Sequence, residues 1–167
     1  PEDVAETVAL AAASGLAGCS IEDWDPEAEA IYELALARDR RLYAGGAFSA
    51  IAGQSRDRLA AFELATQTLT SWNPGADAPV RALATFTDMN ADTTIYAGGD
   101  FTMAGGQARS RLAAIAGASG LAVPGFAPAG TSAAVLAPAV NVTNAYARAQ
   151  CRTLGGAALP FLCRVDR

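Results

Sequence analysis

Three carboxylates stand close together near the start of the chain, at Glu22, Asp23 and Asp25. They follow the run 17–21 (AGCSI), whose small and apolar residues predict a short strand buried on both faces. In parallel α/β sheets ligands lie beyond the carboxyl ends of strands, and Mg²⁺ prefers carboxylate oxygens. The position of Glu22, Asp23 and Asp25 at the end of a predicted strand makes them a candidate metal site. A solvated acidic turn is the interpretation that we favour, because this cluster alone supplies too few oxygens for octahedral Mg²⁺.

The composition excludes several other chemistries. The chain has no His, and all 12 of its basic residues are Arg. It therefore has no Ser-His-Asp or Cys-His relay, no His metal ligand, no Schiff-base lysine and no P-loop lysine. The net charge of −5 argues against a nucleic-acid partner. The most apolar stretch, 120–142, contains three prolines, so no membrane span is predicted.

Two helices are expected to flank the predicted strand. Residues 2–14 have apolar positions at helical spacing and end at Gly15. Residues 26–38 have Pro26 in the first turn and place Ile31, Leu34 and Ala35 on one face. Ten acidic residues and one Arg lie in 1–39, whereas seven acidic residues and eleven Arg lie in 40–167. This break in charge predicts a boundary between an α/β segment, 1–39, and the rest of the chain.

The acidic segment resembles a stretch of the isocitrate lyase/phosphoenolpyruvate mutase superfamily over residues 1–37. The resemblance is carried by PEDVAETV at 1–8, AGCSIED at 17–23 and IYELALA at 31–37. It implies part of a TIM barrel from a Mg²⁺-dependent enzyme that makes or breaks C–C or P–C bonds, with Glu22 helping to hold the metal. The Asp-x-Asp metal motif and the catalytic loop of that family have no counterpart here. A truncated lyase or mutase lacking most of its active site is therefore the alternative function.

The middle of the chain contains an internal repeat. LYAGGAFS at 42–49 recurs as IYAGGDFT at 95–102, an offset of 53 residues. The same offset relates Gly53-Gln54 to Gly106-Gln107, and Arg56-x-Arg-Leu-Ala-Ala to the run that begins at Arg109. With one residue of slippage, Trp72-Asn73-Pro74 matches Phe126-Ala127-Pro128. Matches in register over this length indicate duplication.

Each copy is predicted to form four short strands. In the second copy these are 80–86, 94–102 (kinked at Gly98-Gly99), 111–116 and 121–123. Four strands in about 50 residues are typical of a propeller blade. Residues 41–130 resemble delta-sixty-type β-propeller repeats of large bacterial cell-surface or secreted proteins, which implies a scaffold or binding role. Asp57 is expected in a salt-bridged loop, and Asp100 in a structural turn rather than as a Ca²⁺ ligand.

The tail, 131–167, has two interpretations. Tyr146-Ala147 echoes Tyr96-Ala97, which favours a degenerate third repeat; an irregular tail or a shifted reading frame is the alternative. Cys151 and Cys163 form a disulfide only if the chain is exported, and the sequence does not decide this.

Together these observations predict a mainly β chain: two propeller-like blades (40–130) preceded by a helix–strand–helix unit (1–39). The expected function is a non-enzymatic propeller-repeat module, a binding or surface scaffold without a cofactor; Mg²⁺ belongs to the enzyme alternative. A protein or a surface glycan is the kind of partner implied, and open sheet edges predict self-association. The repeats imply an extracellular or cell-surface location, and the N-terminal segment a cytoplasmic one.

Overall fold

A computed structural model describes residues 31–126 and the backbone of the strands in 135–140, 144–149 and 163–166. The described regular structure is entirely β, with no helix among these residues, so the prediction of a mainly β chain is confirmed. The helix predicted at 2–14 and the strand predicted at 17–21 lie outside the described residues. The strands are β1 (Ile31–Leu36), β2 (Arg41–Gly46), β3 (Ala50–Ile51), β4 (Gln54–Ser55), β5 (Leu59–Glu63), β6 (Thr68–Leu69), β7 (Val80–Thr87), β8 (Thr93–Gly99), β9 (Met103–Ala104), β10 (Gln107–Ala108), β11 (Leu112–Ala116), β12 (Val135–Val140), β13 (Asn144–Ala149) and β14 (Cys163–Asp166).

The helix predicted over 26–38 is wrong for residues 31–36, which form strand β1. β1 pairs with β2, and the register skips one residue at Tyr32, which is a β-bulge. The extra residue brings Ile31 and Leu34, three positions apart, to the same apolar cluster. A spacing of three is also helical, so the bulge produced the apolar pattern that indicated a helix.

Two sheets account for the region 31–126. The first sheet has the order β1-β2-β5-β6, and the second has the order β11-β8-β7. The hairpins β3–β4 and β9–β10 interrupt the two sheets at matching places. Of the strands predicted in the second copy, 80–86 forms within β7, 111–116 forms from Leu112 onward, and 94–102 forms as far as Gly99. The strand predicted at 121–123 is reduced to one bridge between Ile115 and Ala122.

The registers of the two sheets are equivalent residue by residue. Tyr43 lies between Ala35 and Ala61, and Tyr96 lies between Ala84 and Ala114. The bulge recurs as well, because the pairing of β7 with β8 skips Arg81 as that of β1 with β2 skips Tyr32. The duplicated sequence thus has a duplicated backbone arrangement.

A third sheet, of order β12-β13-β14, has the same register. Tyr146 lies between Ala139 and Arg164, which is the position of Tyr43 and Tyr96 in the other sheets. The pairing of β12 with β13 skips Leu136, three residues before Ala139, just as Tyr32 lies three residues before Ala35, so the bulge recurs here too. The backbone arrangement of the first two sheets is therefore present three times.

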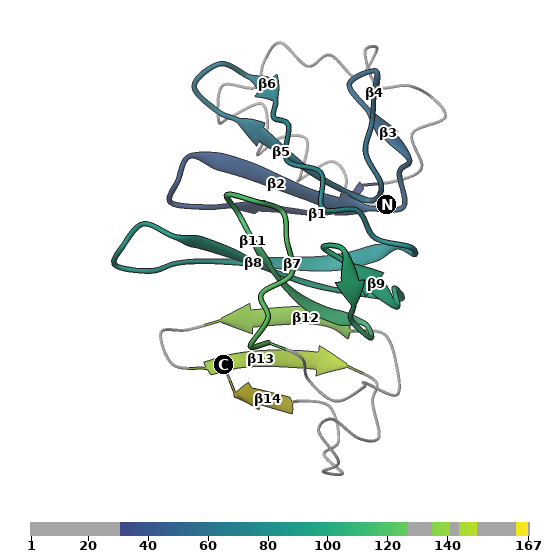
Figure 1. Ribbon diagram of the computed structural model, residues 1–167, viewed down its shortest axis with the longest axis vertical. Coiled ribbons are helices and arrows are strands. Elements are labelled where there is room, and N and C mark those ends of the chain that lie inside the picture. Colours follow the sequence, from purple (N-terminus) through teal and green to yellow (C-terminus); the bar gives the residue numbers. More distant parts are fainter. Residues whose placement is uncertain (1–30, 127–134, 141–143, 150–162, 167) are drawn as a thin grey trace.

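The three sheets follow one another in chain order down Figure 1, from the purple strands to the yellow-green ones. β1 and β2 pack against β7, and β12 packs against β7 and β8. The main core lies between the first and second sheets and contains large side chains from both, including Tyr43, Leu59, Trp72, Val80, Ile95, Phe101 and Ile115. β1, β7 and β12 are edge strands of their sheets. β7 packs against both β1 and β12, so the three edge strands lie next to one another in chain order.

Candidate functional site

The repeated motif Gln-x-Arg, at 54–56 and 107–109, makes the same internal hydrogen bonds in both copies. Arg56 donates from Nη1 to the Ser55 carbonyl (2.7 Å) and from Nη2 to the Thr70 carbonyl (2.6 Å) and to Gln54 Oε1 (3.3 Å). Arg109 makes the same three bonds, to the Ala108 and Val123 carbonyls and to Gln107 Oε1, at 2.8, 3.2 and 2.8 Å. Both arginines are 8% exposed. Their guanidinium groups are therefore committed to the hairpins and are not accessible to a ligand.

The second arginine of each Arg-x-Arg landmark has a backbone role. Arg58 and Arg111 lie in the left-handed region, with φ of 66° and 63°, and donate their amide N–H to the carbonyls of Phe48 and Phe101. Arg58 Nη1 also donates to the Ala76 carbonyl (2.8 Å). Asp57 is exposed and has no ion pair among the described residues, so the expected salt-bridged loop is wrong. Its neighbouring arginines donate to main-chain carbonyls instead.

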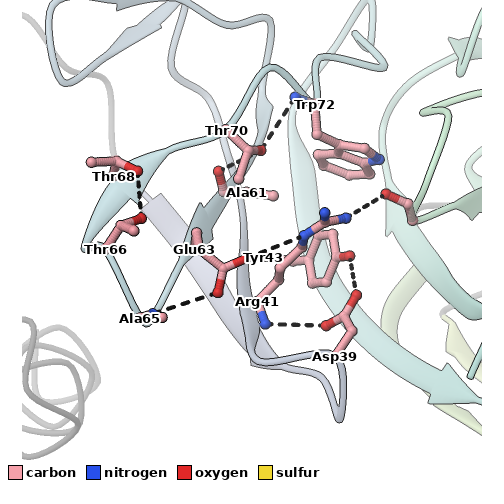
Figure 2. A network of polar contacts seen from close by, with 11 residues as sticks. Asp39, Arg41, Tyr43, Ala61, Glu63, Ala65, Thr66, Thr68, Thr70 and Trp72 are labelled. Carbon is pink, nitrogen blue, oxygen red and sulfur yellow. Dashed lines mark hydrogen bonds and ion pairs between the residues drawn. The ribbon is translucent and has the colours of Figure 1, made fainter.

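The aromatic landmarks form the seam between the first two sheets, part of which is drawn in Figure 2. Tyr43 and Trp72 are T-shaped, with centroids 5.0 Å apart. Tyr43 Oη donates to Asp39 Oδ2 (2.9 Å), and burial together with this carboxylate raises the pKa of Tyr43 well above its ordinary value. Trp72 Nε1 donates across the seam to the Ala116 carbonyl (3.1 Å), and Arg41 Nη1 to the Gly117 carbonyl (3.2 Å).

The second copy has the equivalent aromatic pair. Tyr96 and Phe126 are T-shaped with centroids 5.3 Å apart, and both side chains are buried. Phe126 thus takes the place of Trp72, as the alignment with one residue of slippage predicts. These aromatic residues pack the core, so a candidate binding site has to be sought among exposed side chains.

One exposed cluster combines an aromatic ring, a cation and a carboxylate. Arg81 donates to Asp100 Oδ2 from Nε (2.7 Å) and from Nη2 (2.5 Å), and its Cζ lies 5.8 Å from the centroid of the Tyr32 ring. Tyr32 is 45% exposed, and the side chains of Arg81 and Asp100 are 42% and 34% exposed. The hydrogen bond and the charge of Asp100 raise the pKa of Arg81, whose guanidinium is a cation already at its ordinary pKa.

The fold builds this cluster at equivalent points of neighbouring sheets. Tyr32 and Arg81 are the bulged residues of β1 and β7, and bulges re-aim side chains out of the regular alternation. Asp100 follows β8, and its amide N–H donates to the Pro79 carbonyl (2.9 Å), which fixes it beside the start of β7. Sequence reasoning treated Asp100 as a turn residue and missed Tyr32 and Arg81. Their equivalent positions, 49 residues apart, become visible only in the strand registers, so the sequence held no signal that could have identified them.

The residues predicted to bind metal, Glu22 and Asp23, lie outside the described residues. Within the described part of the chain, no group of three His, Cys, Asp or Glu side chains is placed to hold a metal ion. The carboxylate of Asp100 is bound to Arg81, as suits a structural turn better than a Ca²⁺ ligand. Over the same described residues, no helix has the length and apolarity needed to cross a membrane.

Comparison with known proteins finds no matching family model, no matching curated protein and no matching solved structure.

Proposed function

We propose that this chain is a non-enzymatic repeat module of the delta-sixty β-propeller type that binds a surface glycan. Three sheets with one shared register and with their first strands side by side support a blade-like arrangement. The repeat landmarks support a scaffold, because Arg56, Arg109, Tyr43 and Trp72 all serve packing or internal hydrogen bonds.

The observation that carries the binding role is the exposed cluster of Tyr32, Arg81 and Asp100. An exposed aromatic ring offers an apolar surface to the C–H face of a sugar. The Arg81–Asp100 pair supplies donors and acceptors in a fixed geometry for sugar hydroxyl groups. Both bonds from Arg81 end on Asp100 Oδ2, so Oδ1 has no partner among the described residues and is available to a ligand hydroxyl.

The test is a titration of the protein with a panel of neutral and acidic oligosaccharides, followed by NMR and calorimetry. We expect binding by at least one of them, lost in Tyr32→Ala and retained in Tyr32→Phe, which keeps the ring. Met89→Ala is the matched control, because Met89 is fully exposed in the turn at the opposite end of β7. No binding by any saccharide, or binding that Tyr32→Ala leaves unchanged, would contradict the proposal.

A further inference from the structure

The outer face of the first sheet carries an apolar cluster on the side away from the second sheet. Its buried members are Ala44, Phe48, Ile51 and Ala60. Four further apolar side chains pack against them and are only partly buried: Ile31, Leu34, Phe62 and Leu69. Among the described strands, none from the other two sheets packs on this face, which lies at one end of the stack in Figure 1.

The equivalent face of the second sheet is covered by another sheet. The residues equivalent to the four buried members, Ala97, Phe101, Ala104 and Ala113, all belong to the core between the first and second sheets. They face the side of the first sheet that carries Tyr43 and Trp72. The outer face of the first sheet is thus equivalent to the face of the second sheet that packs on the first sheet.

Burial at equivalent positions separates the covered face from the uncovered one. In the second sheet Val80, Leu83, Ile115 and Ala122 are 0%, 7%, 0% and 3% exposed. Their equivalents in the first sheet, Ile31, Leu34, Phe62 and Leu69, are as apolar and as large or larger, yet they remain partly exposed. An apolar face of this kind marks an interaction surface.

The third sheet, at the other end of the stack, has the same backbone register as the first two. Its register places Tyr146 where the first and second sheets have Tyr43 and Tyr96, the tyrosines of the two aromatic pairs. We call the outer face of the first sheet the receiving face. The face of the third sheet that, by register, corresponds to the Tyr43 side of the first sheet is the inserting face. Such complementary faces make head-to-tail contacts, which close into a ring when the rotation allows.

We propose that the outer face of the first sheet docks the third sheet of a second copy of this chain. Two such contacts join two chains into one ring of six sheets, within the range of about 4–8 blades that closed propellers have. The proposed contact between two chains has the same packing as the contact between the first and second sheets within one chain.

The first experiment measures the mass of the full chain by sedimentation equilibrium over a range of concentrations. We expect a dimer, and a loss of affinity of about a hundredfold or more in Leu69→Arg, which puts an unpaired charge into the contact. Thr68→Arg is the matched control, because Thr68 is the exposed neighbour on the same short strand and should leave the mass unchanged. Circular dichroism verifies that each variant is folded.

A mixing experiment tests the head-to-tail geometry. Leu69→Arg blocks the receiving face, and Tyr146→Arg blocks the register position of the inserting face. Each variant alone should be a monomer, whereas an equimolar mixture should form a heterodimer through the one intact pair of faces. A monomeric wild-type chain, a dimer that survives Leu69→Arg, or a mixture that stays monomeric would overturn the proposal. The first of these results would mean that the face is covered within a single chain.

Discussion

At the scale of single residues, the two copies use the same side chains for the same bonds. Arg56 and Arg109 are buried cations without a described carboxylate partner, and each instead donates to two main-chain carbonyls and a glutamine. The planar guanidinium holds five N–H donors in a fixed fork, so it reaches these acceptors in one geometry, whereas a lysine ammonium is a compact point charge on a flexible stem. The repetition of the motif in the sequence therefore has a structural cause and does not mark a catalytic site.

Trp72 is the residue whose replacement should have the largest effect at this scale. It is 6% exposed, packs on Tyr43 and bonds to Ala116 across the seam. Trp72→Ala should lower the free energy of unfolding by about 3–5 kcal/mol. Trp72→Phe should cost about 1 kcal/mol, because the ring is kept and the Ala116 carbonyl still accepts from the Gly120 N–H. Urea unfolding measures both changes. A loss below about 1 kcal/mol in Trp72→Ala would contradict the packing of Trp72 between the first two sheets.

At the scale of elements, Gly99 lets the end of β8 approach the segment that leads into β7. A Cβ on Gly99 would lie within contact of the Pro79 carbonyl oxygen and 3.0 Å from the Val80 Cα, and both are backbone atoms that cannot give way locally.

Gly99→Ala should therefore lower the free energy of unfolding by about 3 kcal/mol or more. Gly125→Ala is the control, since a Cβ there meets nothing within 4 Å. Thermal and urea melts compare the two variants. Equal stabilities would show that the approach of β8 to Pro79 is looser than described.

Asp77 couples the linker after the first sheet to the β9 hairpin of the second. Its Oδ1 accepts from the backbone N–H of Thr102 (2.8 Å) and Met103 (2.9 Å), and its Oδ2 accepts from the Thr102 hydroxyl. Desolvation acts to raise the pKa of Asp77, but these hydrogen bonds outweigh it, and the pKa lies below its ordinary value.

A carboxylate whose pKa is lowered by folding stabilises the fold above its unfolded pKa of about 3.9, and that contribution is lost as the pH falls through the lower folded pKa. Asp77→Asn should cost about 1 kcal/mol at neutral pH and should reduce the loss of stability between neutral pH and strong acid. Urea unfolding as a function of pH measures both effects. Asp57→Asn, at an exposed carboxylate without an ion pair among the described residues, is the matched control for the loss of stability at neutral pH.

At the scale of the whole molecule, the question is whether residues 1–37, which resemble part of a lyase or mutase, bind metal. Glu22 and Asp23 lack the Asp-x-Asp partner of that family, and the barrel that would complete the ligand set needs at least ~200 residues. Titration calorimetry of the full chain with Mg²⁺ should therefore detect no binding tighter than millimolar. A micromolar affinity that disappears in Glu22→Ala would contradict this and support the enzyme alternative.

The sequence by itself determined the strands 80–86 and 111–116 and the mainly β class, because alternation and turn residues act over a few neighbours. Only the tertiary structure decided that residues 31–36 form a strand, since a bulge is defined by the partner strand β2. It also decided the candidate site. Tyr32, Arg81 and Asp100 are brought together by two bulges and by the packing of one sheet on the next, and such long-range contacts leave no local pattern in the chain.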